Sequence, residues 1–541
     1  MILDMLHASY RSGTSDRALL GETIGAVLRR TVLEHGDREA LVDVPSGRRW
    51  TYAELDADVD RVACGLLALG LGKGDRLAVW APNVPEWVLV QYATARLGVV
   101  LVTVNPAYRP HELAFVLTQS GARVLVSAQQ HKTSDYRAMV GEVRAGCPEL
   151  ASVLYLGDSS WDDLLAAPAV DLAGYEAALS FDDPINIQYT SGTTGFPKGA
   201  TLSHHNILNN GLFVGQLCGY TPDDRVCVPV PFYHCFGMVM GNLGALTHGA
   251  CVVIPAPSFE PLATLRAVEQ ERCTSLYGVP TMFIAELAEG VAGHDLSSLR
   301  TGIMAGSPCP VEVMKQVVSD MRMSEVTICY GMTETSPVST QTRADDDLEL
   351  RVSTVGRVHP HVEVKVVDAV TGLVVEEGQP GELCTRGYSV MLGYWDQPDK
   401  TAESIDAAGW MHTGDLATMD TAGYLRIVGR IKDMVIRGGE NIYPRELEEF
   451  LYSHPDVADV QVLGVPDPKY GEELLAAVRL RPGATTTEDE LREFCRGRVA
   501  HYKVPRYVRF VDEFPMTVTG KVQKFKMREQ AVSELGLPSP S

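Results

Sequence analysis

The sequence predicts an α/β protein with a large N-terminal domain of mixed or parallel sheets, a small β-barrel-like region and a small α+β C-terminal domain. The chain has 541 residues, which is too many for one compact core. Short apolar runs alternate with helical stretches over the first two thirds of the chain, and short alternating segments with Gly-rich turns follow them. After Arg430, a unit of about 110 residues combines two helical stretches with two apolar strands.

The N-terminal region begins with a legible helix and strand. In "TYAELDADVDRVACGLLALGLGKGDRLAVWAPN", Thr51 and Glu54 have capping-box spacing, apolar residues follow at helical spacing, and "RLAVWA" is a short buried strand. The runs "GVVLVTV", "ARVLVSA" and "SVLYLG" continue the alternation, and "RVCVPVP", "ACVVIPA", "TSLYGV" and "RTGIMAG" repeat it. Apolar strands separated by helices predict largely parallel sheets covered on both faces.

The pattern changes near residue 355. "VEVKVVD", "GELCTRG" and "GYLRIVGR" alternate between apolar and polar residues, which predicts an antiparallel β region. In the last part, "YPRELEEFLYSH" and "TEDELREFCRGRVA" are expected as helices, and "ADVQVLGVP" and "LLAAVRLRP" as strands. The paired glycines and charges of "GRIKDMVIRGGEN" suit an exposed junction between domains.

Composition excludes several classes of function. Net charge is 47 − 69 = −22, which repels nucleic-acid phosphates, so no nucleic-acid partner is expected. Eleven cysteines without a CxxC pair indicate reduced thiols in a cytoplasmic protein. Asp4 and His7 interrupt the apolar core that a signal peptide needs. Gln91 and Arg96 interrupt the most apolar long stretch, so no membrane span is expected.

The stretch "YTSGTTGFPKGATLSHHN", residues 189–206, has the composition of a phosphate-binding loop. Backbone N–H groups of a Gly-rich turn form an anion-holding nest, and threonine and serine hydroxyls add donors. Lys198 follows Pro197 and precedes Gly199, so the loop does not match the nucleoside-triphosphate pattern that ends in Gly-Lys-Ser/Thr. A flexible polar loop is the alternative reading of this composition.

Further motifs follow in a fixed order. They are "YGMTETSP" at residues 330–337, "MHTGDLA" with Asp415, "GRIKD" with Arg430, and "PMTVTGKVQK" with Lys521. Together with the loop they resemble the adenylate-forming (AMP-binding) superfamily of acyl-CoA synthetases, peptide-synthetase adenylation domains and luciferases. The resemblance covers essentially the whole chain. Segments such as "PFYHCFGMVMGNLGALTHGA" and "RGGENIYPRELE" are most similar to bacterial medium-chain fatty acyl-CoA synthetases.

The resemblance implies an ATP-dependent ligase that adenylates a carboxylic acid, releases pyrophosphate and transfers the acyl group to coenzyme A. It implies ATP, Mg²⁺ and coenzyme A as cofactors, with Glu334 holding Mg²⁺ and Lys521 bridging the acid and the α-phosphate. Asp415 is assigned to the ribose hydroxyls and Arg430 to ribose or phosphate. The phosphate loop comprises Thr190, Ser191, Gly192, Thr193, Thr194, Gly195 and Lys198. The adenine site comprises Ala305, Gly306 and Ser307 on one side, and Tyr330, Gly331, Met332 and Thr333 on the other.

For the thioester step, relatives rotate a mobile C-terminal domain. The resemblance therefore implies an N-terminal domain at 1–430, a hinge at 431–433 that contains Lys432, and a cap at 434–541. Gly438 and Gly439 are expected to face the pantetheine channel, where a thin backbone leaves room for the arm. His234 is expected as an aromatic gate near the carboxylate, with a buried structural histidine as the alternative.

The acid is expected to be a medium-chain fatty acid or an aryl acid. The expected lining of its pocket is Phe236, Gly237, Met238, Val239, Tyr277, Gly278, Ile303, Met304 and Met332. None of these is a lysine or arginine, which favours an alkyl or aryl tail over a second carboxylate. Other acceptors or oxyanions (a carrier protein, an amine, nitrite-type chemistry) and a non-catalytic nucleotide-binding module stay open as alternatives. The oligomeric state, with a homodimer as one option, stays open as well.

Overall fold

The computed structural model describes residues 7–190, 197–307, 309–438, 440–516 and 522–537. The chain divides into two compact units, which are described separately here. The larger unit consists of Arg11–Val364 and Thr385–Met411, and the smaller unit of Met1–Tyr10, Lys365–Cys384 and His412–Ser541. The hinge expected at 431–433 falls within the smaller unit and remains a prediction.

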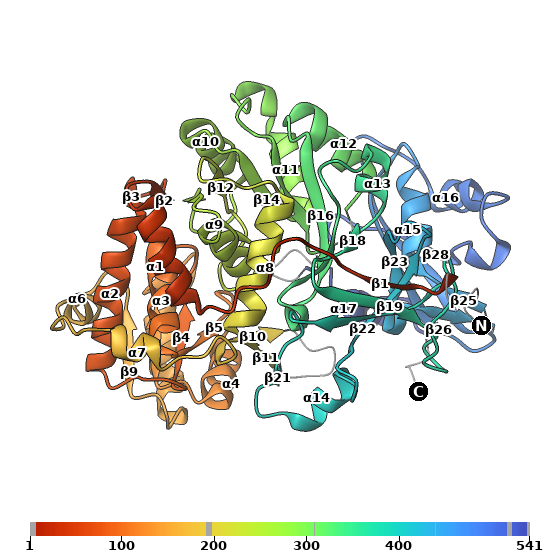
Figure 1. Cartoon of the computed structure of the whole chain (residues 1–541). Coiled ribbons are helices and arrows are strands. Elements are labelled where there is room, and N and C mark those ends of the chain that lie inside the picture. The colour runs from red at the N-terminus through yellow and green to blue at the C-terminus, as the bar shows by residue number, and fades with distance from the viewer. Residues whose placement is uncertain (1–6, 191–196, 308, 439, 517–521, 538–541) are drawn as a thin grey trace. The chain divides into compact units, whose positions relative to one another are not determined.

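The larger unit contains a seven-stranded sheet (Figure 1). Five strands, β10, β5, β4, β6 and β9, are neighbours in the sheet and pair in parallel. β11 pairs with β10 and β21 pairs with β11, both in antiparallel orientation. The predicted apolar runs therefore form parallel strands, as expected. In sheet order the strands are β21 (Gly393–Tyr394), β11 (Lys198–Ser203), β10 (Pro184–Thr190), β5 (Val100–Thr103), β4 (Arg76–Trp80), β6 (Val124–Ser127) and β9 (Ser152–Tyr155).

A nine-stranded sheet completes the larger unit. Its central strands are parallel, whereas both ends of the sheet are antiparallel. In sheet order the strands are β18 (Arg357–Val358), β17 (Val338–Gln341), β16 (Glu325–Gly331), β15 (Thr301–Ala305), β14 (Ser275–Gly278), β12 (Arg225–Cys227), β13 (Cys251–Ile254), β2 (Glu39–Asp43) and β3 (Arg48–Thr51). The predicted class of parallel and mixed sheets in a large domain is confirmed.

Helices cover these sheets and share one core with them. Val79 and Leu101 of the first sheet belong to the same buried cluster as Tyr277 and Ile303 of the second. Thr51 and Glu54 form the predicted capping box at the start of α2. The longer helices are α1 (Ile24–His35), α2 (Tyr52–Ala68), α3 (Pro85–Leu97), α4 (Pro110–Ser120), α5 (Tyr136–Val143), α8 (His204–Leu217), α10 (Pro261–Glu271), α11 (Pro280–Glu289) and α12 (Val311–Asp320). Five shorter helices are α6 (Ser159–Leu165), α7 (Ala173–Ala177), α9 (Gly244–Leu246), α13 (Leu348–Ser353) and α14 (Pro398–Ser404).

The predicted antiparallel β region is a five-stranded sheet. Its strands in order are β1 (Tyr10–Ser12), β19 (Val362–Val367), β20 (Gly381–Gly387), β22 (Met411–Met419) and β23 (Leu425–Arg430). β22 and β23 form an antiparallel pair in which Asp415 lies opposite Arg430. The "GELCTRG" and "GYLRIVGR" segments are therefore strands, as expected.

The C-terminal part of the smaller unit is an α+β layer. Leu463 and Leu475 face one side with α17, whereas Val462 and Leu474 face the other with α15 and α16, as the alternation of side chains along a strand requires. The sheet has the order β25 (Glu440–Ile442), β24 (Val435–Arg437), β27 (Gly471–Leu480) and β26 (Val457–Asp467), with β28 (Tyr507–Phe510) beside β27. The helices are α15 (Pro444–Tyr452), α16 (Glu488–Cys495) and α17 (Lys524–Leu535).

One helix is shorter than the sequence pattern suggests. α16 ends at Cys495, whereas the helical stretch was expected to continue through Ala500. Gly497 has a φ of +73°, a left-handed conformation that ends helices and that glycine adopts without steric cost. The glycine therefore outweighs the helical composition of the residues around it.

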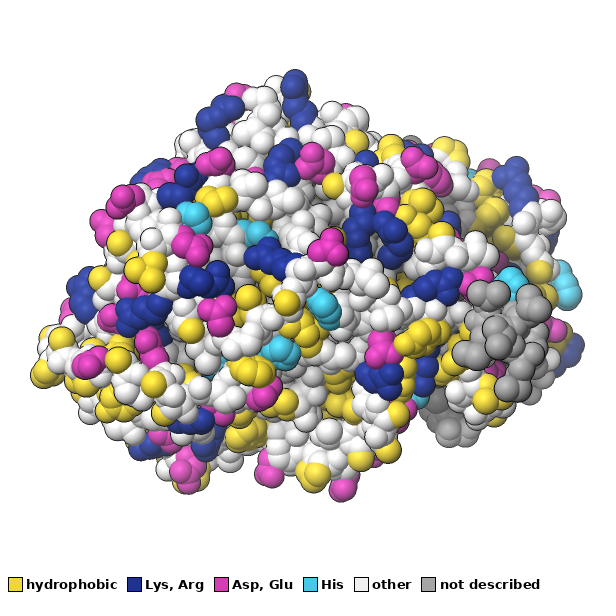
Figure 2. Space-filling model, viewed as in Figure 1, with side chains coloured by type: hydrophobic (Ala, Val, Ile, Leu, Met, Phe, Trp, Pro, Cys, Tyr) yellow, Lys and Arg dark blue, Asp and Glu magenta, His cyan; other side chains and the backbone are white. Residues whose placement is uncertain are grey.

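Burial and charge agree with the composition. All eleven cysteines are free, and all but Cys309 are buried. Figure 2 shows basic and acidic side chains interspersed over the face that it presents. No helix in the described part of the chain is long and apolar enough to cross a membrane.

Candidate active site

The predicted phosphate loop lies at the tip of the β10–β11 hairpin. Thr190 ends β10 and pairs with Lys198, which begins β11. The Thr190 hydroxyl donates to the Lys198 carbonyl at 3.4 Å, and the Lys198 Nζ lies 4.8 Å from the centroid of the Tyr394 ring. Ser191, Gly192, Thr193, Thr194 and Gly195, which complete the loop, lie outside the described residues. The hairpin therefore holds the two ends of the loop next to each other.

Glu334 is a buried carboxylate in the short 3₁₀ turn Thr333–Thr335, with 5% of its surface exposed. The Tyr394 hydroxyl donates to its Oε1 at 2.8 Å. Burial, followed by the neighbouring Glu334 carboxylate, raises the pKa of Tyr394, so this phenol stays a neutral donor. Lys198, Tyr394 and Glu334 thus form a continuous series of contacts within the larger unit. Tyr394 was not assigned a role from sequence, because its partner lies 60 residues away.

The two predicted adenine segments lie at the ends of neighbouring strands. β15 is parallel to β16, and Ala305 at the end of β15 lies opposite Cys329, just before Tyr330 and Gly331. In open parallel sheets, ligands bind outside the carboxyl ends of the strands. The fold therefore brings Ala305, Gly306 and Ser307 close to Tyr330 and Gly331 at such an edge. Gly306 has a φ of +90°, a conformation that side chains other than glycine rarely adopt.

The turn after β16 allows no side chain at Gly331. A Cβ on this residue would lie 1.8 Å from the carbonyl oxygen of Pro337. The Met332 N–H donates to the same carbonyl at 3.0 Å, and the Thr335 hydroxyl donates to it at 2.7 Å. These two bonds to the Pro337 carbonyl close the turn that carries Glu334.

The expected acid pocket is formed around a buried π-helix, Phe236–Leu243. π-Helical turns are rare and occur frequently at functional sites. The Phe236 ring stacks on Tyr277 with centroids 5.5 Å apart, and the Tyr277 hydroxyl donates to the Met240 carbonyl at 3.1 Å. These contacts connect the π-helix to the end of β14 through apolar and neutral groups.

Two expected members of this pocket face opposite sides of β15. Ile303 and Ala305 belong to the core between the two sheets, together with Tyr277. Successive side chains of a strand point to opposite faces, so Met304 points away from that core. Met304 is therefore separated from Tyr277 and Ile303 by the sheet itself.

His234 and Cys235, adjacent in sequence, contact different partners. The Nδ1 of His234 accepts a hydrogen bond from the Phe236 N–H at 3.2 Å, at the start of the π-helix. The Cys235 thiol donates to the Gln188 side chain at 3.0 Å, and burial raises its pKa. These two hydrogen bonds place His234 at the start of the π-helix and give Cys235 the environment of an inert buried thiol.

In the smaller unit, Asp415 and Arg430 form a cross-strand ion pair. The Arg430 Nε lies 2.9 Å from the Asp415 Oδ1, and 57% of the arginine side chain is exposed. Solvent screens such a pair, so we assign it no appreciable stabilising effect on the fold. The exposed side chain of Arg430 is accessible to a ligand from solvent.

The part of β22 that leads to Asp415 is held by hydrogen bonds to β20. Thr413 donates to the Leu383 carbonyl at 2.7 Å, and the Asp415 N–H donates to the Thr413 hydroxyl at 3.1 Å. The Gly414 N–H donates to the Oε1 of Glu382 at 3.1 Å. Glu382 carries no motif of its own in the sequence, although "GELCTRG" predicted the strand on which it lies.

The other predicted residues of the smaller unit lie in two places. Lys432 is exposed in the 3₁₀ turn Ile431–Asp433. Gly438 has a φ of +59° and donates its N–H to the Tyr470 carbonyl at 2.8 Å. Gly439 and Lys521 lie outside the described residues.

Comparison with known families covers both units. The family model described as "AMP-binding enzyme" matches residues 28–395, and the one described as "AMP-binding enzyme C-terminal domain" matches residues 446–521. YngI of Bacillus subtilis (strain 168) is 49% identical to this chain, covering 96% of it and 99% of YngI. "Medium-chain acyl-CoA ligase ACSF2, mitochondrial" of Danio rerio is 46% identical, covering 98% of this chain and 92% of the relative.

Solved structures of similar enzymes share the fold of this chain over nearly its whole length. ATP-bound MatB from Rhodopseudomonas palustris is 32% identical with a TM-score of 0.85, covering 94% of this chain and 99% of that chain. The anthranilate CoA ligase AuaEII in complex with anthranoyl-AMP is 26% identical with a TM-score of 0.88, covering 96% and 99%.

Proposed function

This chain belongs to the AMP-binding enzyme family, and from that membership we propose a role for each residue of the candidate site. The protein is an AMP-forming acid–thiol ligase: it adenylates a carboxylic acid with ATP, releases pyrophosphate and transfers the acyl group to coenzyme A. It uses ATP, Mg²⁺ and coenzyme A. The residue roles and the identity of the acid are our proposals.

These roles rest mainly on one observation: the two expected adenine segments and Glu334 lie close together at the ends of β15 and β16. Ala305, Gly306 and Ser307 form one wall for the adenine, and Tyr330 to Thr333 form the other, at the carboxyl ends of β15 and β16. Glu334 follows directly and is buried. A nucleotide between these walls would direct its phosphates toward Lys198 and the hairpin loop.

Glu334 suits Mg²⁺ because a buried carboxylate that accepts a hydrogen bond from a neutral phenol at Oε1 is an oxygen ligand for a hard cation. When bound, the ion neutralises phosphate charge. Tyr394 holds the carboxylate in position, and Lys198 screens the phosphates. Asp415 accepts the ribose hydroxyls, with Arg430 beside it.

Lys521 stabilises the negative charge that develops when the acid attacks the α-phosphorus. Two anions must approach each other in this step, and a positioned ammonium group favours the transition state more than the separated reactants.

In the thioester step we propose that the C-terminal domain, residues 434–541, turns about Lys432. Gly438 and Gly439 then line the path of the pantetheine arm.

The acid that we propose is a medium-chain fatty acid. Phe236, Met238, Val239 and Tyr277 offer an apolar surface, and the Tyr277 hydroxyl is already donated to the backbone. An aliphatic chain can bury its surface there, whereas a second carboxylate would find no cation among the expected lining residues. The relative at 46% identity is named a medium-chain acyl-CoA ligase, which supports this choice.

A cytoplasmic location is also part of the proposal. It rests on eleven free thiols, which persist in a reducing compartment. A homodimer is a further option for its assembly, and sedimentation of the purified protein would decide it.

The test is pyrophosphate release from ATP with straight-chain acids from butanoate to octadecanoate, with benzoate, and with dicarboxylates, each with and without coenzyme A. We expect the highest kcat/KM for chains near octanoate and an acyl-CoA product when coenzyme A is present. A maximum for benzoate or for a dicarboxylate would contradict the proposed acid. Weaker activity of all acids in the Glu334→Gln variant would support the proposed site, and unchanged activity would contradict it.

A further inference from the structure

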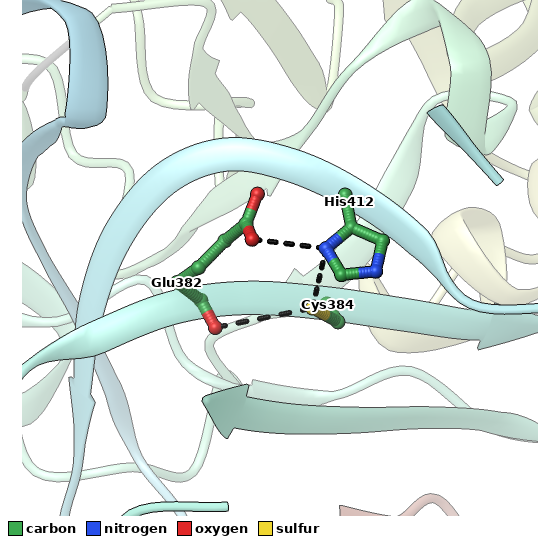
Figure 3. A group of neighbouring side chains, drawn as sticks. All are labelled: Glu382, Cys384 and His412. Carbon is green, nitrogen blue, oxygen red and sulfur yellow. Dashed lines mark hydrogen bonds and ion pairs between the residues drawn. The ribbon is translucent and has the colours of Figure 1, made fainter. Parts of the chain in front are cut away.

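Glu382, Cys384 and His412 converge on one point of the smaller unit (Figure 3). Glu382 and Cys384 are two residues apart on β20, so their side chains share a face of the strand. His412 comes from β22, the neighbouring strand in the sheet. We propose that these three side chains bind a thiophilic divalent cation, with Zn²⁺ as the preferred ion.

The distances suit such an ion. The ligand atoms of the three residues all lie within 4.8 Å of one another. The Cys384 Sγ lies 3.6 Å from the His412 Nδ1, and a tetrahedral zinc with bonds of about 2.3 Å to sulfur and about 2.0 Å to nitrogen would place them about 3.5 Å apart. The His412 Nδ1 and the Glu382 Oε2 are at hydrogen-bond distance, 2.9 Å, and a small rotation of the glutamate opens this edge for the ion.

The donor set selects the class of metal. A thiolate, an imidazole and a carboxylate are the ligands of zinc and similar transition ions, whereas Mg²⁺ prefers oxygen ligands alone. Three protein ligands leave the fourth position of a tetrahedral site for water. The His412 side chain is 35% exposed, so an ion can reach the cluster from solvent. The site is therefore chemically distinct from the Mg²⁺ ligand Glu334, which lies in the larger unit.

Hydrogen bonds of Glu382 connect the three proposed metal ligands to the strand segment that carries Asp415, the proposed ribose-binding residue. The Oε1 of Glu382 accepts the Gly414 N–H, while its Oε2 faces His412. One carboxylate can therefore hold the backbone of β22 at Gly414 and a metal at the same time. On binding, the Cys384 thiol releases its proton to solvent, and the His412 imidazole carries its proton on Nε2, so that Sγ and Nδ1 both donate to the ion.

The competing description is a hydrogen-bonded trio without a metal, in which His412 donates to Glu382 and contacts the thiol. Cobalt titration of the full chain, freed of metal by a chelator and kept in excess Mg²⁺, separates the two. We expect one Co²⁺ per chain, with a thiolate-to-cobalt charge-transfer band in the near ultraviolet. Zn²⁺ should displace the cobalt and raise the Tm, because it binds the native state.

Single-residue variants test whether the charge-transfer band arises from Glu382, Cys384 and His412. Cys384→Ser should abolish the band, and His412→Ala or Glu382→Gln should weaken binding by at least about tenfold. The matched control is Cys147→Ser, since Cys147 is also buried and its thiol contacts the Val143 carbonyl and Thr118. This control should keep the band and the zinc-dependent rise in Tm.

Several results would overturn the proposal. They are a wild-type protein without the charge-transfer band, a band that survives in Cys384→Ser, or a band that disappears in Cys147→Ser. Should His412→Ala fail to fold, Glu382→Gln gives the same reading. An equal zinc-dependent rise in Tm in wild type and Cys384→Ser would also count against it.

Discussion

Glu334 shows how one side chain of the site is fixed from two directions. Its backbone carbonyl accepts the Met391 N–H at 2.9 Å, and its Oε1 accepts the Tyr394 hydroxyl at 2.8 Å. Both partners belong to the segment 385–411 of the larger unit. The carboxylate is thus prepositioned, as a proposed ligand of Mg²⁺ needs to be.

Removing the charge of Glu334 should therefore lower kcat/KM for adenylation more than removing the hydrogen bond from Tyr394. We expect Glu334→Gln to lower kcat/KM for adenylation by about 100-fold or more, since it removes the carboxylate that we propose holds Mg²⁺ beside the reacting phosphates. Tyr394→Phe removes one hydrogen bond and should lower it only about fivefold, equivalent to about 1 kcal/mol. ATP–pyrophosphate exchange measures both. Equal losses in the two variants would contradict the role of the charge.

Asp415 is expected to recognise the ribose, and this role has a direct signature. Wild type should prefer ATP to 2′-deoxy-ATP by about tenfold, because a hydrogen bond to a charged group contributes about 1.5 kcal/mol or more. Asp415→Ala should weaken binding of both nucleotides and bring their ratio close to one. ATP–pyrophosphate exchange with each nucleotide gives the ratio. A variant that still prefers ATP by the same factor would show that another residue reads the ribose.

At the scale of elements, local patterns predicted the strands and helices, and long-range contacts escaped prediction. The runs that form β4 and β6 are buried on both faces, so their composition alone identified them. The π-helix at Phe236–Leu243 escaped because its apolar sequence has no local sign of the wider winding. The contributions of Tyr394 and Glu382 were not predicted from the sequence. Tyr394 is hydrogen-bonded to Glu334 and Glu382 to Gly414, and the residues of each pair lie far apart in the chain.

The turn after β16 gives a stability prediction. Gly331→Ala places a Cβ 1.8 Å from the Pro337 carbonyl, which belongs to the backbone, so the turn must distort. We expect the free energy of unfolding to fall by at least about 2 kcal/mol. Gly141→Ala is the matched control: Gly141 lies in helix α5 with open space around it, and alanine there should stabilise by about 0.5–1 kcal/mol. Urea unfolding followed by tryptophan fluorescence reports the larger unit, which contains all six tryptophans. A neutral Gly331→Ala would refute the steric argument.

The first residue of α8 gives a pH prediction. Burial lowers the pKa of His204 to about 3, and its Nδ1 accepts the Ile24 N–H. Because the pKa in the unfolded chain is about 6.5, the unfolded state binds more protons between these values, and stability falls as pH falls below about 6.5. From pH 7 to pH 5 this histidine should remove about 2 kcal/mol. His204→Gln, followed by the same fluorescence assay, should show a correspondingly smaller loss. An unchanged loss would assign the pH dependence to other groups.

At the scale of the whole molecule, the sequence indicated a two-part enzyme through motifs distributed along the chain. Family models match the two parts separately, at 28–395 and 446–521. The net charge of −22 cannot itself attract ATP or a carboxylate, so we expect local groups such as Lys198 and Arg430 to provide the field. The identity of the acid depends on the shape of an apolar surface, and composition does not specify that shape.

Motion of the C-terminal domain about Lys432 should separate the two half-reactions. Proline at this position fixes φ near −65° and restricts the residue before it, whereas alanine leaves both free. We therefore expect Lys432→Pro to keep adenylate formation near the wild-type rate and to lower thioester formation by at least about tenfold. Lys432→Ala, which leaves the backbone at this exposed position free to turn, should keep the domain motion. Lys521→Ala should do the reverse, lowering adenylation and sparing thioester formation from a supplied acyl adenylate. Single-turnover assays of each half-reaction measure these effects. If Lys432→Pro turns over normally, or if it loses both steps equally, the domain does not turn at this residue.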